Sequence, residues 1–256
     1  MPNSAVGHFK VTEETMNSTF KDKLKALYPF RVEMHAHTLP VSPCSEVTPE
    51  ELIEIYSKRD YDAVVLTNHF TKSLFSGMTK EEAVNYYYKD FEDLIKAGIK
   101  HNMMVYLGIE IRFENESYND FLIYGVDKSV IERAYDYLDT DLRTFRNEVK
   151  LDNSVLLQAH PYRTDNIADS SLLDGIEMLN MHPGHNSRIG LAIKYAVRND
   201  HRILTAGSDF HHPNLEHDGN AALRFRNLPK DSFEIAEILK SGDYVIDLAG
   251  EVIVLP

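Results

Sequence analysis

Short apolar runs rich in Val, Leu and Ile alternate with amphipathic stretches along most of this chain. The apolar runs predict buried strands over residues 31–35, 61–67, 103–111, 121–124, 155–158, 175–179, 202–206 and 244–246. Apolar positions at helical spacing predict helices over residues 20–27, 49–59, 80–96, 130–149, 189–198 and 232–239. Strands that alternate with helices are typical of parallel β-α-β units, so we expect a barrel that is closed or nearly closed.

Sequence signals mark the ends of two of these helices. Thr48 is followed directly by Pro49, and Thr79 is followed three residues later by Glu82. Both patterns are typical of a helix N-terminus, where the threonine hydroxyl accepts a hydrogen bond from a backbone N–H. We expect the second of these helices to end near Gly98.

The length of 256 residues suits one α/β barrel domain. No internal repeat, low-complexity tract or linker interrupts the sequence, so we expect residues 1–30 to form an N-terminal extension and residues 31–256 a single domain. The net charge of −13 argues against binding to a nucleic-acid duplex, whose phosphates attract basic surfaces. A small phosphorylated partner remains compatible, because bound divalent cations would dominate the local field.

Cellular location is predicted from cysteine usage and from apolar segments. Cys44 is the only cysteine, which excludes an internal disulfide and fits a reducing compartment. No apolar stretch approaches the roughly 20 residues needed to span a bilayer, and residues 1–25 lack the hydrophobic core of a secretory signal. We therefore expect a cytoplasmic protein with no membrane association.

Side chains that bind metal ions recur at the ends of the predicted strands. His35 and His37 lie two residues apart, and residues two apart in a strand point to the same face. Asp209 and His211 repeat this spacing. The full series is His35, His37, His69, Glu110, His160, Asp209 and His211. Active groups of a parallel barrel lie at the C-terminal ends of its strands, and these donors suit Zn, Mn or Fe in more than one metal site.

The order His-x-His, Asn-His, Gly-x-Glu, Ala-His-Pro and Gly-Ser-Asp-x-His resembles the PHP family, named for polymerase and histidinol phosphatase. The resemblance covers about residues 31–211, and the last motif is quite specific. It implies a distorted seven-stranded (β/α)7 barrel with a trinuclear metal site at the mouth. It also implies phosphoesterase activity on small phosphate esters or nucleotides, with the full series above as metal ligands.

The sequence departs from the family pattern at three positions. Cys44 lies where many members have an Asp or His ligand, and could bind a metal as a thiolate. Asn68 replaces a frequent Asp, so a supporting carboxylate is lost there. Asp120 replaces a His and is a weaker ligand candidate. A further ligand is expected between the fourth and fifth motifs, where the candidates are Glu177, Asn180, His182 and His185. The expected number of ions is therefore two or three.

Arg163 is the candidate for binding a substrate phosphate, because a guanidinium can hold a phosphate through two hydrogen bonds. The alternative for Arg163 is a surface ion pair with Asp165 or Asp169. Arg188 is a second, weaker candidate.

We therefore expect a metal-dependent phosphoric ester hydrolase that acts on a small phosphorylated metabolite, either a phosphomonoester or a nucleotide. Asp209, His211 and Arg163 are the expected catalytic residues. A hydroxide bridging two metal ions would attack phosphorus while the ions and Arg163 hold the other oxygens.

Two alternatives remain open. An amidohydrolase-like barrel also opens with His-x-His but attacks a carbon centre; such enzymes typically end on a lone Asp, and many bridge their metals with a modified lysine. This chain ends its series on Asp-x-His and has no lysine at a predicted strand end, which favours phosphoester chemistry. A non-catalytic metal-binding module is the other alternative, and the departures at Cys44 and Asn68 would favour it if fewer than two metals were bound.

Overall fold

The computed structural model describes residues 19–116, 118–199, 203–213 and 220–256. The first 18 residues of the predicted extension lie outside this part of the chain, as does Arg202, the first residue of a predicted strand. The first of two six-stranded sheets contains, in spatial order, β12 (Val252–Val254), β11 (Val245–Leu248), β10 (Ala221–Phe225), β1 (Phe30–Ala36), β2 (Ala63–Leu66) and β4 (Met104–Leu107). The second contains β3 (His69–Phe70), β5 (Ile109–Ile111), β6 (Phe121–Tyr124), β7 (Val155–Gln158), β8 (Gly175–Asn180) and β9 (Ile203–Gly207).

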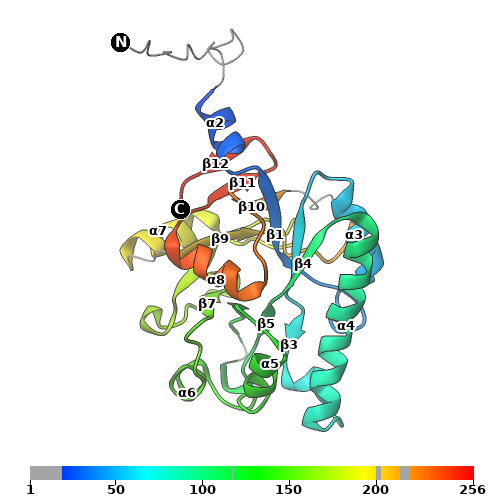
Figure 1. The fold of residues 1–256 in the computed structure, drawn as a ribbon. Helices are drawn as coiled ribbons and strands as arrows, with labels where there is room; N and C mark the ends of the chain where they lie inside the picture. Colours follow the sequence, from blue (N-terminus) through cyan, green and yellow to red (C-terminus); the bar gives the residue numbers. More distant parts are fainter. Residues whose placement is uncertain (1–18, 117, 200–202, 214–219) are drawn as a thin grey trace, which may run out of the picture.

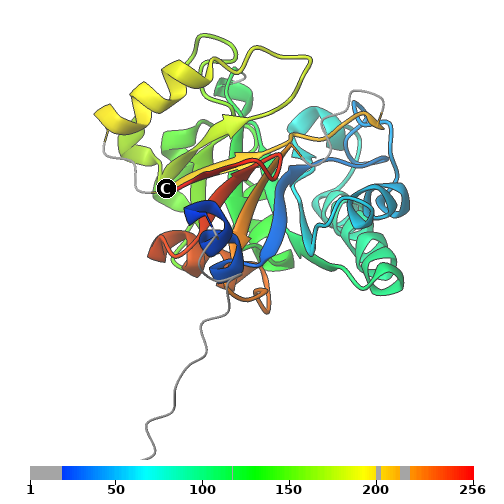
Figure 2. The same ribbon diagram turned by 90° about the horizontal axis from the view of Figure 1, so that it is seen from above.

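Helices surround the two sheets. The α-helices are α2 (Phe20–Leu27), α3 (Pro49–Ser57), α4 (Lys80–His101), α5 (Lys128–Tyr135), α6 (Leu142–Glu148), α7 (Ile189–Arg198) and α8 (Ser232–Ser241). Short 3-10 helices cover Lys72–Phe75, Glu114–Glu116 and Ser170–Leu172. Helices α3 and α4 lie side by side on one flank of the strands, while α7 and α8 lie on the other flank (Figures 1 and 2).

The predicted helix starts are confirmed, but one predicted helix end is wrong. The side chains of Thr48 and Thr79 cap α3 and α4 by accepting backbone hydrogen bonds. Helix α4 continues past Gly98 to His101, and its C-cap, Asn102, adopts the left-handed conformation with φ of 53°. Gly98 instead allows close packing, because a Cβ atom there would lie 2.6 Å from the backbone oxygen of Met103.

The single helix predicted over residues 130–149 is also wrong. Two helices, α5 and α6, occupy this stretch, and buried Leu138 lies in the connection between them. Asp141 caps the start of α6 by accepting a hydrogen bond from the backbone N–H of Thr144. Asp141 can begin a new helix because its side chain accepts the backbone N–H of Thr144. In a continuous helix this N–H would instead donate to a backbone carbonyl of the preceding turn.

Of the expected barrel, closed or nearly closed, the closed form is wrong, and the strand pairing does not give a seven-stranded (β/α)7 barrel. Within the described residues, strand pairing gives two sheets and no closed ring, and several neighbouring strands, such as β1 and β10, are antiparallel. The strand predicted over residues 103–111 divides at Gly108 into β4 and β5, which belong to different sheets. Strand β10, which the apolar pattern did not predict, pairs antiparallel with β1.

The main core lies between the sheets and leaves a polar region at the strand ends. Met34 and Leu223 from the first sheet share a buried apolar cluster with Leu157 and Ile176 from the second. The hydroxyl of Tyr124 donates a hydrogen bond of 3.0 Å to the backbone oxygen of Met34, which joins the sheets. Beyond this core, the end of β1 meets the segment that follows β9 through backbone hydrogen bonds.

Candidate metal centre

The residues of the predicted ligand series lie together at this meeting of strand ends. Three groups of side chains have candidate ligand atoms within 4.8 Å of one another. They are His37, His69 and His211; His35, His37 and Asp209; and Glu110, Asp120 and His160. The weaker candidate Asp120 therefore belongs with the predicted series, whereas Cys44, His182 and His185 are in none of these groups.

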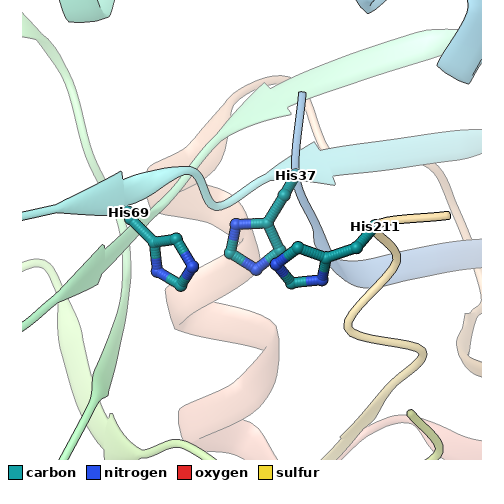
Figure 3. A group of neighbouring side chains, drawn as sticks. All are labelled: His37, His69 and His211. Atoms are coloured by element: carbon teal, nitrogen blue, oxygen red, sulfur yellow. The ribbon is translucent and has the colours of Figure 1, made fainter. Parts of the chain in front are cut away.

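Three imidazoles form the first group, and each comes from a different segment. His37 follows β1, His69 begins β3 and His211 follows β9, and their rings point toward one another in Figure 3. The centroid of the His37 ring lies 4.4 Å from that of His69 and 4.2 Å from that of His211. Three imidazoles at such distances are typical of a transition-metal site.

Asp209 connects the two histidines of the first motif. Its Oδ1 atom lies 3.4 Å from Nε2 of His35 and 3.2 Å from Nε2 of His37. The backbone of Asp209 is left-handed, with φ of 54°, a conformation that costs free energy for a residue other than glycine. The surrounding hydrogen bonds hold the carboxylate in this strained position.

Glu33 supplies part of that support and was missed in the sequence. One carboxylate oxygen, Oε1, accepts hydrogen bonds from the backbone N–H groups of His35, at 2.9 Å, and Ser208, at 3.0 Å. The other oxygen accepts a hydrogen bond of 2.9 Å from the hydroxyl of Tyr56. Glu33 is fully buried, so this clamp fixes β1 against the loop that carries Asp209. An acidic residue inside an apolar strand is the signal that could have revealed it.

Glu110 lies at the centre of the site and contacts four histidines. Oε1 lies 3.4 Å from Nε2 of His35 and 3.0 Å from Nε2 of His160. Oε2 lies 3.5 Å from Nε2 of His37 and 2.6 Å from Nδ1 of His69. This arrangement suits a carboxylate that would help these histidines to hold metal.

Buried atoms without partners show that these residues fit metal ions. Among the described residues, Nε2 of His35, Nε2 of His37 and Oε2 of Glu110 are buried and have no hydrogen-bond partner. His69 approaches Oε2 of Glu110 closely, but not with hydrogen-bond geometry. Leaving a polar group buried and unpaired costs about 1–3 kcal/mol, so a cation shared by these atoms would offset a large penalty.

The ionisation of the site also favours cations. Burial raises the pKa of Glu110 and Asp209, but the nearby histidines lower both pKa values well below the ordinary range. Burial, together with His211 and His69, holds the pKa of His37 well below its usual value, so its ring is neutral. Burial lowers the pKa of His35, but Glu177, Asp209 and Glu110 raise it well above the usual value. In the metal-free protein, protons therefore balance part of the negative charge.

The candidates for the further ligand have different surroundings. Oε1 of Glu177 lies 2.8 Å from Nδ1 of His35, and Oε2 accepts the backbone N–H of His160 at 3.0 Å. Glu177 therefore orients two histidines of the series. Asn180 donates to Glu177 at 2.9 Å. His182 and His185 lie with ring centroids 4.6 Å apart and line the cavity over the site.

Arg163 is tied to the site and not to the surface. Its Nη2 atom donates to Oδ1 of Asn180 at 2.6 Å and lies 2.8 Å from Oδ2 of Asp209. Nε of Arg163 is buried without a hydrogen-bond partner. The alternative acidic partners, Asp165 and Asp169, form ion pairs with Arg188 and with Arg143.

A cavity of about 460 Å³ lies over the site. Its described lining residues are Cys44, His69, Arg112, Asp120, His160, Arg163, Thr164, His182, His185, Asp209, His211 and His212. Partial desolvation raises the pKa of the Cys44 thiol, but hydrogen bonds with His211 and His69 lower it to about 6. Arg112 holds Asp120 through two hydrogen bonds of 2.6 and 2.7 Å. The cavity thus combines candidate metal ligands with fixed positive charge.

Comparisons with known proteins agree with this description of the fold. No family model matches the sequence, and no curated protein matches it. The structure is similar to a two-domain protein from Bacteroides vulgatus that contains a predicted PHP-like metal-dependent phosphoesterase, with a TM-score of 0.55 and 17% identity. The match covers 85% of this chain and 64% of that protein, so this chain spans less than two thirds of its length.

Two further structures match less well. A protein from Bifidobacterium adolescentis that was assigned as a metal-dependent phosphoesterase by prediction has a TM-score of 0.45 and 17% identity, over 70% of this chain and 87% of that one. An amidohydrolase from Chromobacterium violaceum, with bound sulfate and no metal, has a TM-score of 0.48 and 16% identity, over 86% of this chain and 98% of that one. The Bacteroides vulgatus match shows that this chain has a PHP-like fold, which confirms at the level of the fold the resemblance inferred from the motifs.

Proposed function

We propose that this protein is a metal-dependent phosphoesterase that releases phosphate from a small phosphorylated molecule. The observation that carries the proposal is the set of buried, unpaired atoms of His35, His37 and Glu110 beneath a cavity that Arg163 also lines. Two or three divalent ions, Zn, Mn or Fe, would be held by His35, His37, His69, Glu110, His160, Asp209 and His211, with Asp120 as an additional ligand. When bound, such ions would lower the pKa of a water molecule and stabilise phosphate oxygens.

Hydrogen bonds prepare the protein side chains for this role. A carboxylate can only accept a hydrogen bond, so Glu177 holds the proton of His35 on Nδ1 and leaves Nε2 free for a metal ion. Arg163 holds Asp209 in place, and its guanidinium lines the cavity, where it would hold a substrate phosphate. Cys44 remains a candidate thiolate ligand, and His182 and His185 are proposed to contact substrate.

The lining of the cavity favours a small, polar phosphate ester over a nucleotide. Among the described lining residues there is no aliphatic side chain, and imidazoles are the only rings. A nucleobase would normally be recognised by stacking on an apolar or aromatic surface, which here only the imidazoles outside the proposed ligand set, His182, His185 and His212, offer. The same lining contains no lysine, which argues against an amidohydrolase-like site that uses a modified lysine.

Phosphate release tests this proposal directly. The chain, loaded with Mn²⁺ or Zn²⁺, would be assayed against sugar phosphates, amino-alcohol phosphates and nucleotides. We expect turnover of a sugar or amino-alcohol phosphate that is lost in Asp209→Ala and retained in Asp139→Ala, which removes an exposed surface carboxylate paired with Lys72. Silence across the panel with metals bound would contradict phosphoesterase activity and favour carbon-centred hydrolysis or a binding role.

The cellular location and the domain division rest on the sequence. No helix in the described residues is long and apolar enough to cross a membrane. We propose the cytoplasm from the single cysteine, and the division into an extension over residues 1–30 and one domain over residues 31–256 stays a prediction.

A further inference from the structure

A buried serine connects the first histidine motif to the Asn-His motif. The hydroxyl oxygen of Ser42 lies 3.3 Å from Nδ1 of His37 and 2.8 Å from Oδ1 of Asn68. It also accepts a hydrogen bond of 3.0 Å from the backbone N–H of His69. Ser42, His37 and Asn68 are all fully buried, so water does not compete for these contacts.

The orientation of the Asn68 amide is determined from both of its ends. The backbone N–H of Thr38 can only donate, and it lies 2.8 Å from the oxygen of Asn68. The carboxylate of Asp90 can only accept, and Oδ2 lies 2.6 Å from the nitrogen of Asn68. Both contacts require the amide oxygen to face Thr38 and Ser42, and the amide nitrogen to face Asp90.

This orientation fixes the direction of the Ser42 hydroxyl. Because Ser42 has a single proton and faces an amide oxygen, it donates that proton to Asn68. Toward His37 it can then only accept, so Nδ1 of His37 must carry the proton. Nε2 of His37 is left with a free lone pair, and this atom is the one that faces Asp209 and Glu110.

Asp90 completes the chain of hydrogen bonds from an unexpected element. It lies on helix α4, is 3% exposed, and also accepts a hydrogen bond of 2.5 Å from the hydroxyl of Thr38. The sequence showed an amide at position 68 where a carboxylate was expected. A buried carboxylate is present after all, but it lies behind Asn68 and reaches His37 through the amide and Ser42.

We propose that Asp90, Asn68 and Ser42 form a relay of positioning residues that keeps the proton of His37 on Nδ1 and its Nε2 atom ready for a metal ion. The relay rests on the proposed metal site, but the position of the proton can be measured in the metal-free chain. Hydrogen bonds to the second nitrogen of a metal-binding histidine typically change metal affinity about 10- to 100-fold.

Nitrogen NMR of the metal-free protein provides the first test. Long-range ¹H–¹⁵N spectra of the ¹⁵N-histidine-labelled chain distinguish the two neutral forms of an imidazole, and His37→Gln identifies the signal. We expect His37 to carry its proton on Nδ1 in the wild type and in Ser42→Thr, and to become a mixture of forms in Ser42→Ala. Ser45→Ala is the matched control, because this buried hydroxyl of the same loop donates to backbone oxygens of His37 and His211 and not to a ring.

Zinc affinity, measured by competition with a chelator, provides the second test. We expect Ser42→Ala to bind the zinc ion at His37 about 10- to 100-fold more weakly, and Ser42→Thr to restore binding. Asp90→Ala should weaken binding because the Asn68 nitrogen loses the nearer of its two acceptors and keeps only the Thr38 hydroxyl at 3.1 Å. Asp90→Asn keeps an acceptor oxygen and should bind within about two-fold of the wild type.

The outcomes separate the relay from the proposed enzyme activity. A wild-type His37 with its proton on Nε2, or one whose form is unchanged in Ser42→Ala, would overturn the relay whether or not the protein hydrolyses phosphate esters. The expected proton position without phosphatase activity would leave the relay standing and contradict only the proposed function. The position of the proton is read from the wild-type spectrum, so this test needs only the assigning variant His37→Gln to fold and does not depend on the folding of the Ser42 variants.

Discussion

Asp90→Asn should make the protein more stable at neutral pH but not at acidic pH. Burial raises the pKa of Asp90 to about 6 from 3.8, against hydrogen bonds from Thr38 and Asn68 that lower it. The folded chain therefore binds this proton more tightly than the unfolded chain does. The stability associated with the protonated group is fully present below about pH 3.8 and is lost as pH rises to about 6.

The size of the effect follows from the same shift. A difference of about two pKa units, at about 1.36 kcal/mol each, gives at most about 3 kcal/mol. Asn in place of Asp90 is neutral at every pH and keeps one acceptor for Thr38 and Asn68. The variant should therefore match the wild type near pH 4 and exceed it by up to about 3 kcal/mol near pH 8.

Urea unfolding of the metal-free wild type and variant, followed by circular dichroism at both pH values, measures this difference. Asp93→Asn is the control on the same helix, because hydrogen bonds from Lys89 and Lys96 lower the pKa of Asp93. Its effect should have the opposite sign and stay under about 1 kcal/mol. An Asp90→Asn variant that is less stable than the wild type at pH 8, or equally altered at both pH values, would refute the reasoning.

Three further predictions concern the site and the fold. Glu177→Ala removes the acceptor for Nδ1 of His35 and should weaken zinc binding about 10- to 100-fold in a chelator competition; unchanged affinity would contradict its orienting role. Against burial, nearby carboxylates raise the pKa of His35, and Glu110 and Cys44 raise the pKa of His69. Metal binding should therefore release protons and become stronger as the pH rises above about 6.5. Calorimetry in buffers of different ionisation enthalpy measures this release, and finding none would contradict the prediction. Gly98→Ala should destabilise the chain by about 1–3 kcal/mol in urea unfolding, because the new Cβ would lie 2.6 Å from a backbone oxygen; a gain in stability would show that the helix can shift to accommodate it.

The ligand series could be predicted because each of its parts is local in the sequence. His35 and His37 share a strand face by their spacing, as Asp209 and His211 were expected to do, and an apolar run before each cluster indicates a strand end. These patterns need no knowledge of which strands are neighbours. The structure accordingly brings the predicted series together.

The supporting residues could not be predicted, because they depend on contacts between distant segments. Glu33 reaches Ser208 across 175 positions, and Asp90 reaches Asn68 from a helix whose buried face looks ordinary in the sequence. The closed barrel was wrong for a related reason: the apolar pattern predicted neither β10 nor its antiparallel pairing with β1. The chain changes sheet at Gly108, which lies close to β2 and to Thr67, the residue that follows β2. These close approaches depend on the fold and cannot be read from the sequence.

We propose that the ligand series His35, His37, His69, Glu110, His160, Asp209 and His211 forms a centre for two or three metal ions around Glu110. The most direct measurement is the number of zinc ions bound per chain after equilibrium dialysis, determined by elemental analysis for the wild type and Glu110→Gln. The account predicts two or three ions in the wild type and fewer in the variant, because Glu110 contacts His35, His37, His69 and His160. A wild-type chain that binds at most one ion, or a variant that binds as many as the wild type, would contradict it.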